Sequence, residues 1–372
     1  MGDRIHSIDS ARAVAMLFVV AIHAEPFGGL GAYGNAANFV IDTTARFAVP
    51  FFFLTSGYLF ATKLERFDGR AYVERYLERV GSIYVAGVVL YAPIVVLLSA
   101  GTAITSGERV QGAVLARVVE SVSPIGLLYY GDSVIVFLWF LPALAISIAL
   151  LYAFVALEKT RYVLPIALAL HVAGVFGQNP SLGVHVPLET RDPLFFGFFY
   201  TALGFYVRSW EWEPRRDRSG LYLILTVVFG AAHVAERYVL GYVLTGDSFS
   251  HAVYGPDYSF ATVPFATALF LFVLSRPSLG KSSRLPTLGT YAVVIYVVHP
   301  LVLYALVGLG EGLDQAGYAV ASTVAWHLAL TPVAYAGSLG LYLVVTRTGI
   351  LERAGSVTLG SRVRRTDAGW RN

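Results

Sequence analysis

The chain has no cysteine and little charge for its length. Of its 372 residues only 14% are charged, and only three of these are lysine. The absence of cysteine excludes disulfides, thiolate metal sites, iron–sulfur clusters and cysteine nucleophiles. A water-soluble domain could not cover its surface with so few charges. The composition therefore argues against a soluble enzyme, a disordered regulator and a nucleic-acid-binding protein.

Apolar and aromatic residues fill the chain instead. Hydrophobic residues make up 56% of it, with 24 Phe and 23 Tyr, and the mean hydropathy is +0.64. Because backbone groups in lipid must be hydrogen-bonded internally and the apolar runs are longer than barrel strands, we expect an all-α polytopic membrane bundle. Apolar stretches of about 20 residues, the length of a membrane-crossing helix, occur at ten places: 12–28, 37–61, 82–99, 134–156, 162–177, 193–208, 219–240, 260–275, 289–308 and 319–346. The sequence thus predicts about ten transmembrane helices in a single domain over residues 1–372, without the internal repeat of many transporters.

The basic residues are distributed unevenly between the two sides of these spans. With the N-terminus in the cytoplasm, 22 of the 27 Lys and Arg residues fall on the cytoplasmic side, and only Arg109, Arg117, Arg191 and Arg237 fall outside. Cytoplasmic loops of membrane proteins carry such an excess. We therefore expect a multi-pass plasma-membrane protein with both termini in the cytoplasm. Residues 354–372 would form a cytoplasmic basic tail, and residues 100–133 an outer loop with a helix on the membrane surface over 107–120.

Ionisable residues within a span are costly, so each is a candidate site residue. Arg12 and His23 are eleven residues apart in the first span, which places them on one helix face about 16 Å apart along its axis. This face suits a long ligand with an anionic head that enters from the cytoplasm, with its phosphates on Arg12 and its reactive end at a general base, His23. The alternative is a snorkelling topology anchor at Arg12 and a packing histidine at position 23.

Arg46 lies about ten residues into the second span, near the expected depth of His23. A permanently charged guanidinium at that depth needs an anion, a carbonyl cluster or water as its partner. A structural pair with Asp42, one turn away, is the alternative to a functional role. Pro50 is expected to bend this helix.

The ninth span contains a histidine next to a proline. Pro300 frees a backbone carbonyl near Tyr296 and bends the helix, and His299 lies at the bend in the outer half of the span. Two roles remain open for His299: it caps the kinked helix, or it takes part in catalysis. His327, near Pro332 in the last span, has the same ambiguity.

Aromatic residues cluster at 137–142 and 195–200. Packing or an interfacial belt is the usual reason for such clusters. Trp139 and Tyr296 are nevertheless candidates for lining a narrow tunnel that holds a pantetheine-like chain.

Four segments together resemble the acyltransferase-3 family of integral-membrane acyltransferases. They are IDSARA at 8–13 with His23 eleven residues after Arg12, RFAVPFFFLTSGY at 46–58, FLWFLPA at 137–143 and GTYAVVIYVVHPL at 289–301. The resemblance implies a roughly ten-helix enzyme that takes an acyl group, commonly acetyl, from cytoplasmic acyl-CoA. It also implies delivery of that group to a hydroxyl of an extracytoplasmic or lipid-linked carbohydrate, with no metal and no nucleic-acid partner.

The resemblance also assigns roles to individual residues. Arg12 and His23 match the essential pair of the family, Arg46 its second-span arginine, and His299 the histidine of its penultimate-span motif. His23 would be the general base, either on the acceptor hydroxyl or on an acyl carrier, and Arg46 would stabilise the charge that develops on the thioester. The CoA phosphates would be bound by Arg12 together with four nearby arginines: Arg66, Arg70, Arg75 and Arg79.

Two functions outside acyl transfer remain open. A secondary transporter or flippase would use the buried His and Arg side chains to bind a substrate anion or to relay protons. A non-enzymatic assembly protein explains so many buried ionisable groups less well.

Overall fold

The computed structural model describes residues 5–132, 134–184, 186, 189–210, 213–250 and 255–347, and this part of the chain is helical with no strand. The predicted basic tail at 354–372 lies outside the described residues. The elements, in chain order, are α1 (His6–Ala24), α2 (Gly31–Ala45), α3 (Ala48–Leu64), α4 (Gly69–Ser106), α5 (Val110–Ser121), η1 (Gly126–Tyr130), η2 (Val136–Trp139), α6 (Phe140–Ala156), η3 (Thr160–Tyr162), α7 (Val163–Gln178), η4 (Pro180–Leu182), η5 (Pro193–Gly197), α8 (Phe198–Ser209), η6 (Arg216–Arg218), α9 (Ser219–Tyr238), η7 (Val239–Val243), α10 (Thr262–Ser275), α11 (Leu285–Gly289), α12 (Ala292–Gln315) and α13 (Val324–Arg347), where η marks short 3₁₀ or π segments.

Eight helical stretches of the described chain are long and apolar enough to cross a membrane. They are His6–Ala24, Gly31–Leu64, Gly69–Ser106, Val136–Ala156, Thr160–Gln178, Arg216–Val243, Ala292–Gln315 and Val324–Arg347. The other two predicted spans, 193–208 and 260–275, coincide with the shorter helices α8 and α10. The prediction of a polytopic helical membrane protein is therefore confirmed, whereas the count of ten and the orientation of the termini stay predictions.

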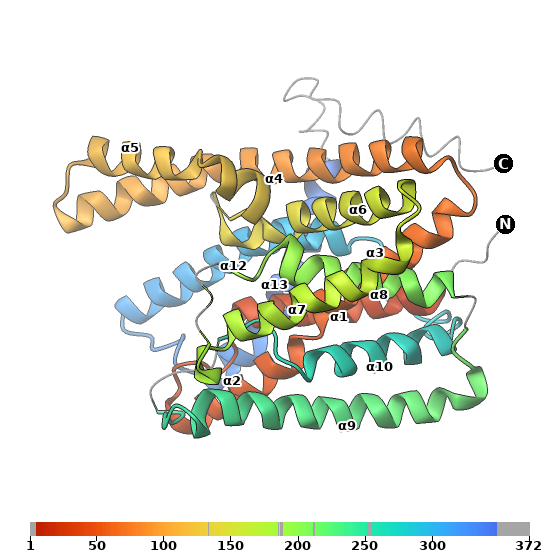
Figure 1. Cartoon of the computed structure of the whole chain (residues 1–372). Helices are drawn as coiled ribbons and strands as arrows, with labels where there is room; N and C mark the ends of the chain where they lie inside the picture. The colour runs from red at the N-terminus through yellow and green to blue at the C-terminus, as the bar shows by residue number, and fades with distance from the viewer. Residues whose placement is uncertain are drawn as a thin grey trace.

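Most of the long helices run side by side, with α1 inside the bundle and α9 at its edge (Figure 1). One hydrophobic core extends from α1 through α3, α6, α7, α8 and α10 to α12 and α13. The apolar side chains of α1 supply its centre, because Met16 and Val20 are almost completely buried there. Helix α1 is therefore a fixed support for any side chain that it carries.

Two glycines allow the backbones of α3 and α8 to approach very closely. A Cβ on Gly57 of α3 would collide with the carbonyl oxygen of Thr201, and a Cβ on Gly204 of α8 would collide with that of Leu54. Only glycine permits backbones to approach so closely. The second predicted span is thereby locked to α8.

That second span is broken into two helices. Helix α2 ends at Ala45 and α3 begins at Ala48, so Arg46 lies at the break. Pro50 has no N–H to donate to the carbonyl of Arg46, which is the physical reason for a break one turn earlier. The expected effect of Pro50 is confirmed.

Helix α4 is longer than a bilayer is thick. Its 38 residues span about 57 Å, against a hydrocarbon core of about 30 Å. It begins at an Asp68 cap, whose carboxylate accepts a 2.8 Å hydrogen bond from the Ala71 N–H, and with α5 it projects beyond the rest of the bundle (Figure 1). Three of the arginines expected to bind CoA, Arg70, Arg75 and Arg79, thus lie on a rigid helix and not in a loop.

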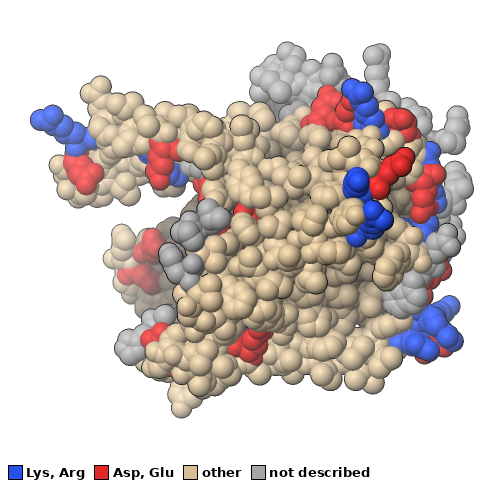
Figure 2. Space-filling model, viewed as in Figure 1, with Lys and Arg blue, Asp and Glu red and all other residues tan. Residues whose placement is uncertain are grey.

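Lys and Arg side chains on the visible face gather near the ends of the bundle where α4 and α9 begin (Figure 2). Arg208 and Glu65 pair there at 2.6 Å, and Arg215 pairs with Asp217 at 2.7 Å. A few charges also lie at the far tip of the α4–α5 projection (Figure 2). This concentration of Lys and Arg near one end of the bundle agrees with the uneven charge distribution from which the orientation of the termini is predicted.

Candidate functional site

A cavity of about 680 Å³ lies at the end of α1 that is remote from Arg12. Its wall is built by the end of α1, the loop after it, α2, the first turn of α3, η2, and the segments before η5 and α10. The residues that line it are Val19, Ile22, His23, Glu25, Gly28, Gly29, Gly31, Asn35, Asn38, Asp42, Arg46, Val49, Val136, Phe137, Trp139, Arg191, Phe196, Ser250, Gly255 and Asp257. Three of the predicted site residues, His23, Arg46 and Trp139, therefore share one cavity.

His23, in the last turn of α1, contacts two rings from other helices. Its ring stacks on that of His299 at a centroid distance of 5.4 Å with an interplanar angle of 24°. The ring of Phe137 packs edge-on against His23 at 4.4 Å. The two histidines that the sequence placed at similar depth are thus brought together, with His23 on the cavity wall and His299 behind it.

His299 is completely buried, and one of its two ring nitrogens has a defined role. Its Nδ1 lies 2.8 Å from the carbonyl oxygen of Tyr296 and 3.1 Å from that of Ile295. Because a carbonyl can only accept, Nδ1 carries the proton and donates it. Pro300 cannot bond to the Tyr296 carbonyl, so the proline leaves this acceptor available. The Nε2 atom then bears a lone pair, and it has no hydrogen-bond partner in the described structure.

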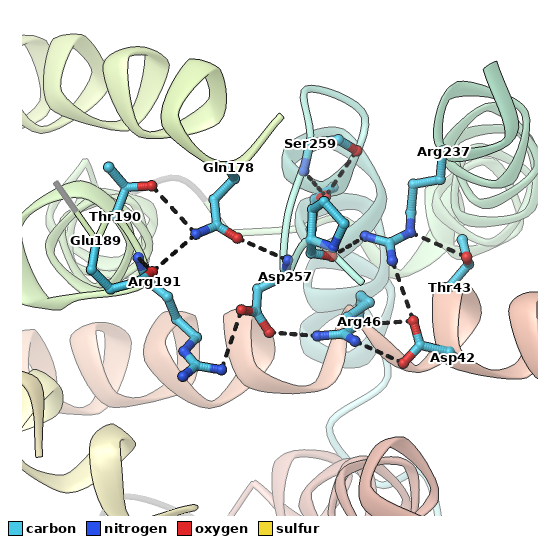
Figure 3. Close-up of polar contacts among 12 residues, drawn as sticks. Asp42, Thr43, Arg46, Gln178, Glu189, Thr190, Arg191, Arg237, Asp257 and Ser259 are labelled. Carbon is cyan, nitrogen blue, oxygen red and sulfur yellow. Dashed lines mark hydrogen bonds and ion pairs between the residues drawn. The ribbon is translucent and has the colours of Figure 1, made fainter. Parts of the chain in front are cut away.

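Arg46 belongs to a network of buried charges (Figure 3). Its guanidinium donates to both carboxylate oxygens of Asp42, at 3.1 and 2.8 Å, and to Asp257 at 2.5 Å. The structural pair with Asp42, the alternative to a functional role, is therefore present. Three of the five N–H donors of a guanidinium are bound to carboxylates, which holds the group rigidly at the cavity wall.

Arg237 is a buried member of this network that the sequence did not single out as a site candidate. Its side chain, in the last turn of α9, is fully buried. It donates to Thr43 at 3.1 Å, to Asp42 at 3.2 Å and to the carbonyl of Pro256 (Figure 3). Its position could have identified it as a candidate site residue, because Arg237 falls inside the predicted span 219–240 and ionisable residues within spans are rare.

Arg191 lines the cavity, although the sequence did not single it out as a site candidate. It lies 3.4 Å from Asp257, and its guanidinium sits 5.4 Å from the centroid of the Trp139 ring. Its neighbour Asp192 accepts hydrogen bonds from the Tyr129 hydroxyl at 2.6 Å and from the Phe195 N–H at 2.7 Å, which fixes this segment. Burial raises the pKa of the Asp192 carboxyl above its ordinary value.

The two predicted substrate-binding aromatics have different surroundings. Trp139 lines the cavity, but it is 8% exposed and is covered by Arg191. The hydroxyl of Tyr296 donates to the carbonyl of Phe137 and accepts from the Phe140 N–H at 3.3 Å. Tyr296 thus holds the turn that carries Phe137 and Trp139.

The predicted CoA-binding arginines lie apart from the cavity. Arg12 is 3.7 Å from Asp9 and within electrostatic range of Arg79. The other four, Arg66, Arg70, Arg75 and Arg79, are exposed, and Arg70 pairs with Glu74 at 2.9 Å. Arg12 and His23 lie on one helix, α1, as predicted. A single ligand must therefore extend along α1 to reach both.

A further histidine contributes to the loop after α1. The Phe27 N–H donates to Nδ1 of His327 at 2.8 Å. Glu25 and Phe27, which flank Pro26, have left-handed φ angles of 44° and 67°. His327 thus stabilises a strained loop next to His23.

The arrangement defines an integral-membrane protein with a buried histidine pair beside a charged cavity. A family model described as an acyltransferase domain, that of the acyltransferase-3 family, matches residues 5–343. The chain belongs to this family.

The curated relatives that match this chain are distantly related to it and are longer than it. Two proteins of Enterococcus faecalis named amino-acid racemase are 28% and 24% identical to this chain, over 60% and 82% of it. A serine/alanine racemase of Enterococcus gallinarum is 25% identical over 59%. The matches span only 30, 42 and 32% of the length of these relatives. No solved structure matches.

Proposed function

We propose that the protein is a membrane-bound O-acyltransferase that uses a cytoplasmic acyl-CoA donor, with acetyl the expected group, and a carbohydrate hydroxyl as acceptor. The observation that carries the proposal is the position of His23. It lies on a cavity wall, stacks on a second histidine and is surrounded by fixed charges. Membership of the acyltransferase-3 family agrees with it.

In the proposed reaction His23 acts as a general base. The imidazole takes the proton of the acceptor hydroxyl as that oxygen attacks the thioester carbon, and CoA leaves as the thiolate, which is then protonated. Arg46 would stabilise the negative charge on the carbonyl oxygen, because its guanidinium is held in place by Asp42 and Asp257 before the substrate binds. His299, whose Nε2 has no partner in the described structure, would accept a hydrogen bond there from the imidazole of His23 or from the acceptor hydroxyl.

The donor and the acceptor would enter from opposite ends of α1. Arg12 and the exposed arginines near the start of α4 would bind the CoA phosphates, and the acyl end would extend about 16 Å along α1 toward His23. Asn35, Asn38 and Asp42 on the cavity wall offer the hydrogen-bonding groups that a carbohydrate needs.

The buried charge network favours one other function. Asp42, Arg46, Arg237, Asp257 and Arg191 would also suit a transporter that binds a charged solute. Such a protein would have no reason to bind CoA.

Ligand-dependent stability of the purified protein separates the two functions. We expect acetyl-CoA and CoA, but not an organic anion without a nucleotide, to raise the thermal midpoint of the wild type in detergent. Arg12→Ala should weaken this shift, whereas Arg215→Ala, whose partner Asp217 is exposed, should leave it unchanged. A folded wild-type sample that shows no shift at millimolar CoA would favour the transporter.

A further inference from the structure

The hydroxyl of Tyr91 is inserted into the backbone of another helix. Tyr91 lies in α4 and is completely buried. Its hydroxyl donates to the carbonyl of Val297 at 2.6 Å and accepts from the N–H of Leu301 at 3.2 Å, both in α12. In a regular α-helix these two backbone groups bond to each other, four residues apart. The tyrosine hydroxyl therefore bridges the partners of one helical hydrogen bond.

This insertion lies directly beside His299. Pro300 already removes the preceding helical bond, the one to the Tyr296 carbonyl. Two consecutive positions of the α12 backbone are thus opened around His299. The Tyr296 carbonyl becomes the acceptor for Nδ1 of His299 at 2.8 Å, and this bond sets both the tautomer and the ring direction.

We propose that Tyr91 is a positioning residue for His299. Its hydroxyl keeps the turn 297–301 open, so that the imidazole stays bonded to the Tyr296 carbonyl and stacked on His23. The expected effect of Tyr91 on catalysis rests on the proposed function. The expected effect on the position and tautomer of His299 does not depend on it.

The surroundings of Tyr91 fix its ring. It packs in a small hydrophobic cluster with Val134, Ile135 and Leu138, separate from the main core. Gly87, one turn earlier in α4, lets Leu138 approach closely, because a Cβ there would lie 2.9 Å from a Leu138 methyl. The same short segment carries Phe137, whose ring contacts His23. Tyr91 is therefore anchored to the element that borders the histidine pair.

The test compares Tyr91→Phe with Tyr84→Phe. In Tyr91→Phe the Leu301 N–H can bond directly to the Val297 carbonyl, so we expect a folded protein with a closed α12 turn and a displaced His299. Transfer should fall in kcat by about 10- to 100-fold, the effect of misplacing a catalytic group by about 1 Å, with the KM for acetyl-CoA unchanged. Tyr84 also lies in α4, and its hydroxyl donates to the carbonyl of Leu127 at 2.7 Å. In the described structure it forms no hydrogen bond with the α12 backbone, so its variant should keep kcat.

A second readout does not depend on activity. In protein labelled with ¹⁵N-histidine, the signal of His299 is identified by its loss in His299→Gln. We expect the protonated-Nδ1 pattern in the wild type and in Tyr84→Phe, and a changed pattern in Tyr91→Phe. If the wild type transfers nothing from acetyl-CoA, the proposed function fails while this spectrum still tests the positioning. An unchanged His299 signal in Tyr91→Phe, or an unchanged kcat in an active protein, would overturn the inference.

Discussion

The imidazole rings of His23 and His299 stack 5.4 Å apart, nearly parallel, although they come from the first and the penultimate predicted spans. His299 has its Nδ1 proton committed to backbone carbonyls and its Nε2 lone pair unpartnered in the described structure. His23 faces the cavity. One imidazole is thus held by the fold, and the other is positioned to meet a substrate.

Removal of the His299 imidazole should lower the rate of acyl transfer more than it lowers the stability of the fold. His299→Ala should lower transfer by about 100-fold, the lower range for an acid–base group, and acetyl-CoA should still raise the thermal midpoint. His171→Ala is the matched control, because His171 is also buried, with Nδ1 3.0 Å from the Phe195 carbonyl and Nε2 unpartnered in the described structure. Its ring stacks on Phe199 and Tyr258, whereas that of His299 stacks on His23. Equal loss of kcat in both variants would show that a general packing defect is responsible.

The buried charges should contribute strongly to stability. Arg237→Ala removes the Arg237 donor of the Pro256 carbonyl and leaves Asp42, among the described residues, paired with Arg46 alone. Breaking a buried pair on one side costs about 3–5 kcal/mol. Denaturant unfolding in detergent measures this loss. Arg218→Ala removes an exposed arginine of the same segment and should change the unfolding free energy by less than about 0.5 kcal/mol. A stable Arg237→Ala protein would mean that the network is dispensable for folding.

The contact between α3 and α8 should tolerate no side chain. Gly57→Ala places a methyl group against the Thr201 carbonyl, so we expect little folded protein in detergent extracts by size-exclusion chromatography. Gly81 in α4 has open space around its Cβ position, and Gly81→Ala should stabilise the helix by up to about 1 kcal/mol. Normal yields of Gly57→Ala would contradict the observed packing.

The loop after His23 should depend on His327. His327→Leu removes the acceptor of the Phe27 N–H, so the strained turn at Glu25 and Phe27 can relax and change the cavity wall. We expect kcat to fall by about 10-fold or more while the protein loses only about 1–3 kcal/mol of stability. His327→Gln, whose amide oxygen can accept the same bond, should recover part of the rate; no recovery would argue against the hydrogen bond as the cause.

The helical membrane fold was predictable because it depends on long apolar runs. All ten predicted spans fall on helices, and the break near Arg46 follows from Pro50. The start of α4 at Gly69 was not predictable. Residues 69–81 are polar enough to suggest a loop, but the Asp68 side chain caps the helix N-terminus there.

The site was only partly predictable. Depth along a span indicated that His23, Arg46 and His299 would be neighbours. Depth alone does not give the rotation of each helix or the partners across loops. Asp257, Arg191 and the hydroxyl of Tyr91 come from segments whose contacts depend on tertiary packing, and no spacing rule reports them.

The central claim is that His23 is the general base for acyl transfer from CoA. The direct measurement is release of the CoA thiol from acetyl-CoA by detergent-purified protein, with water or a simple hexose as acceptor. We predict that the wild type releases CoA and that His23→Gln does so at least about 100-fold more slowly, while acetyl-CoA still raises its thermal midpoint. Wild-type rates in a folded His23→Gln protein, or no release by the wild type, would contradict the claim.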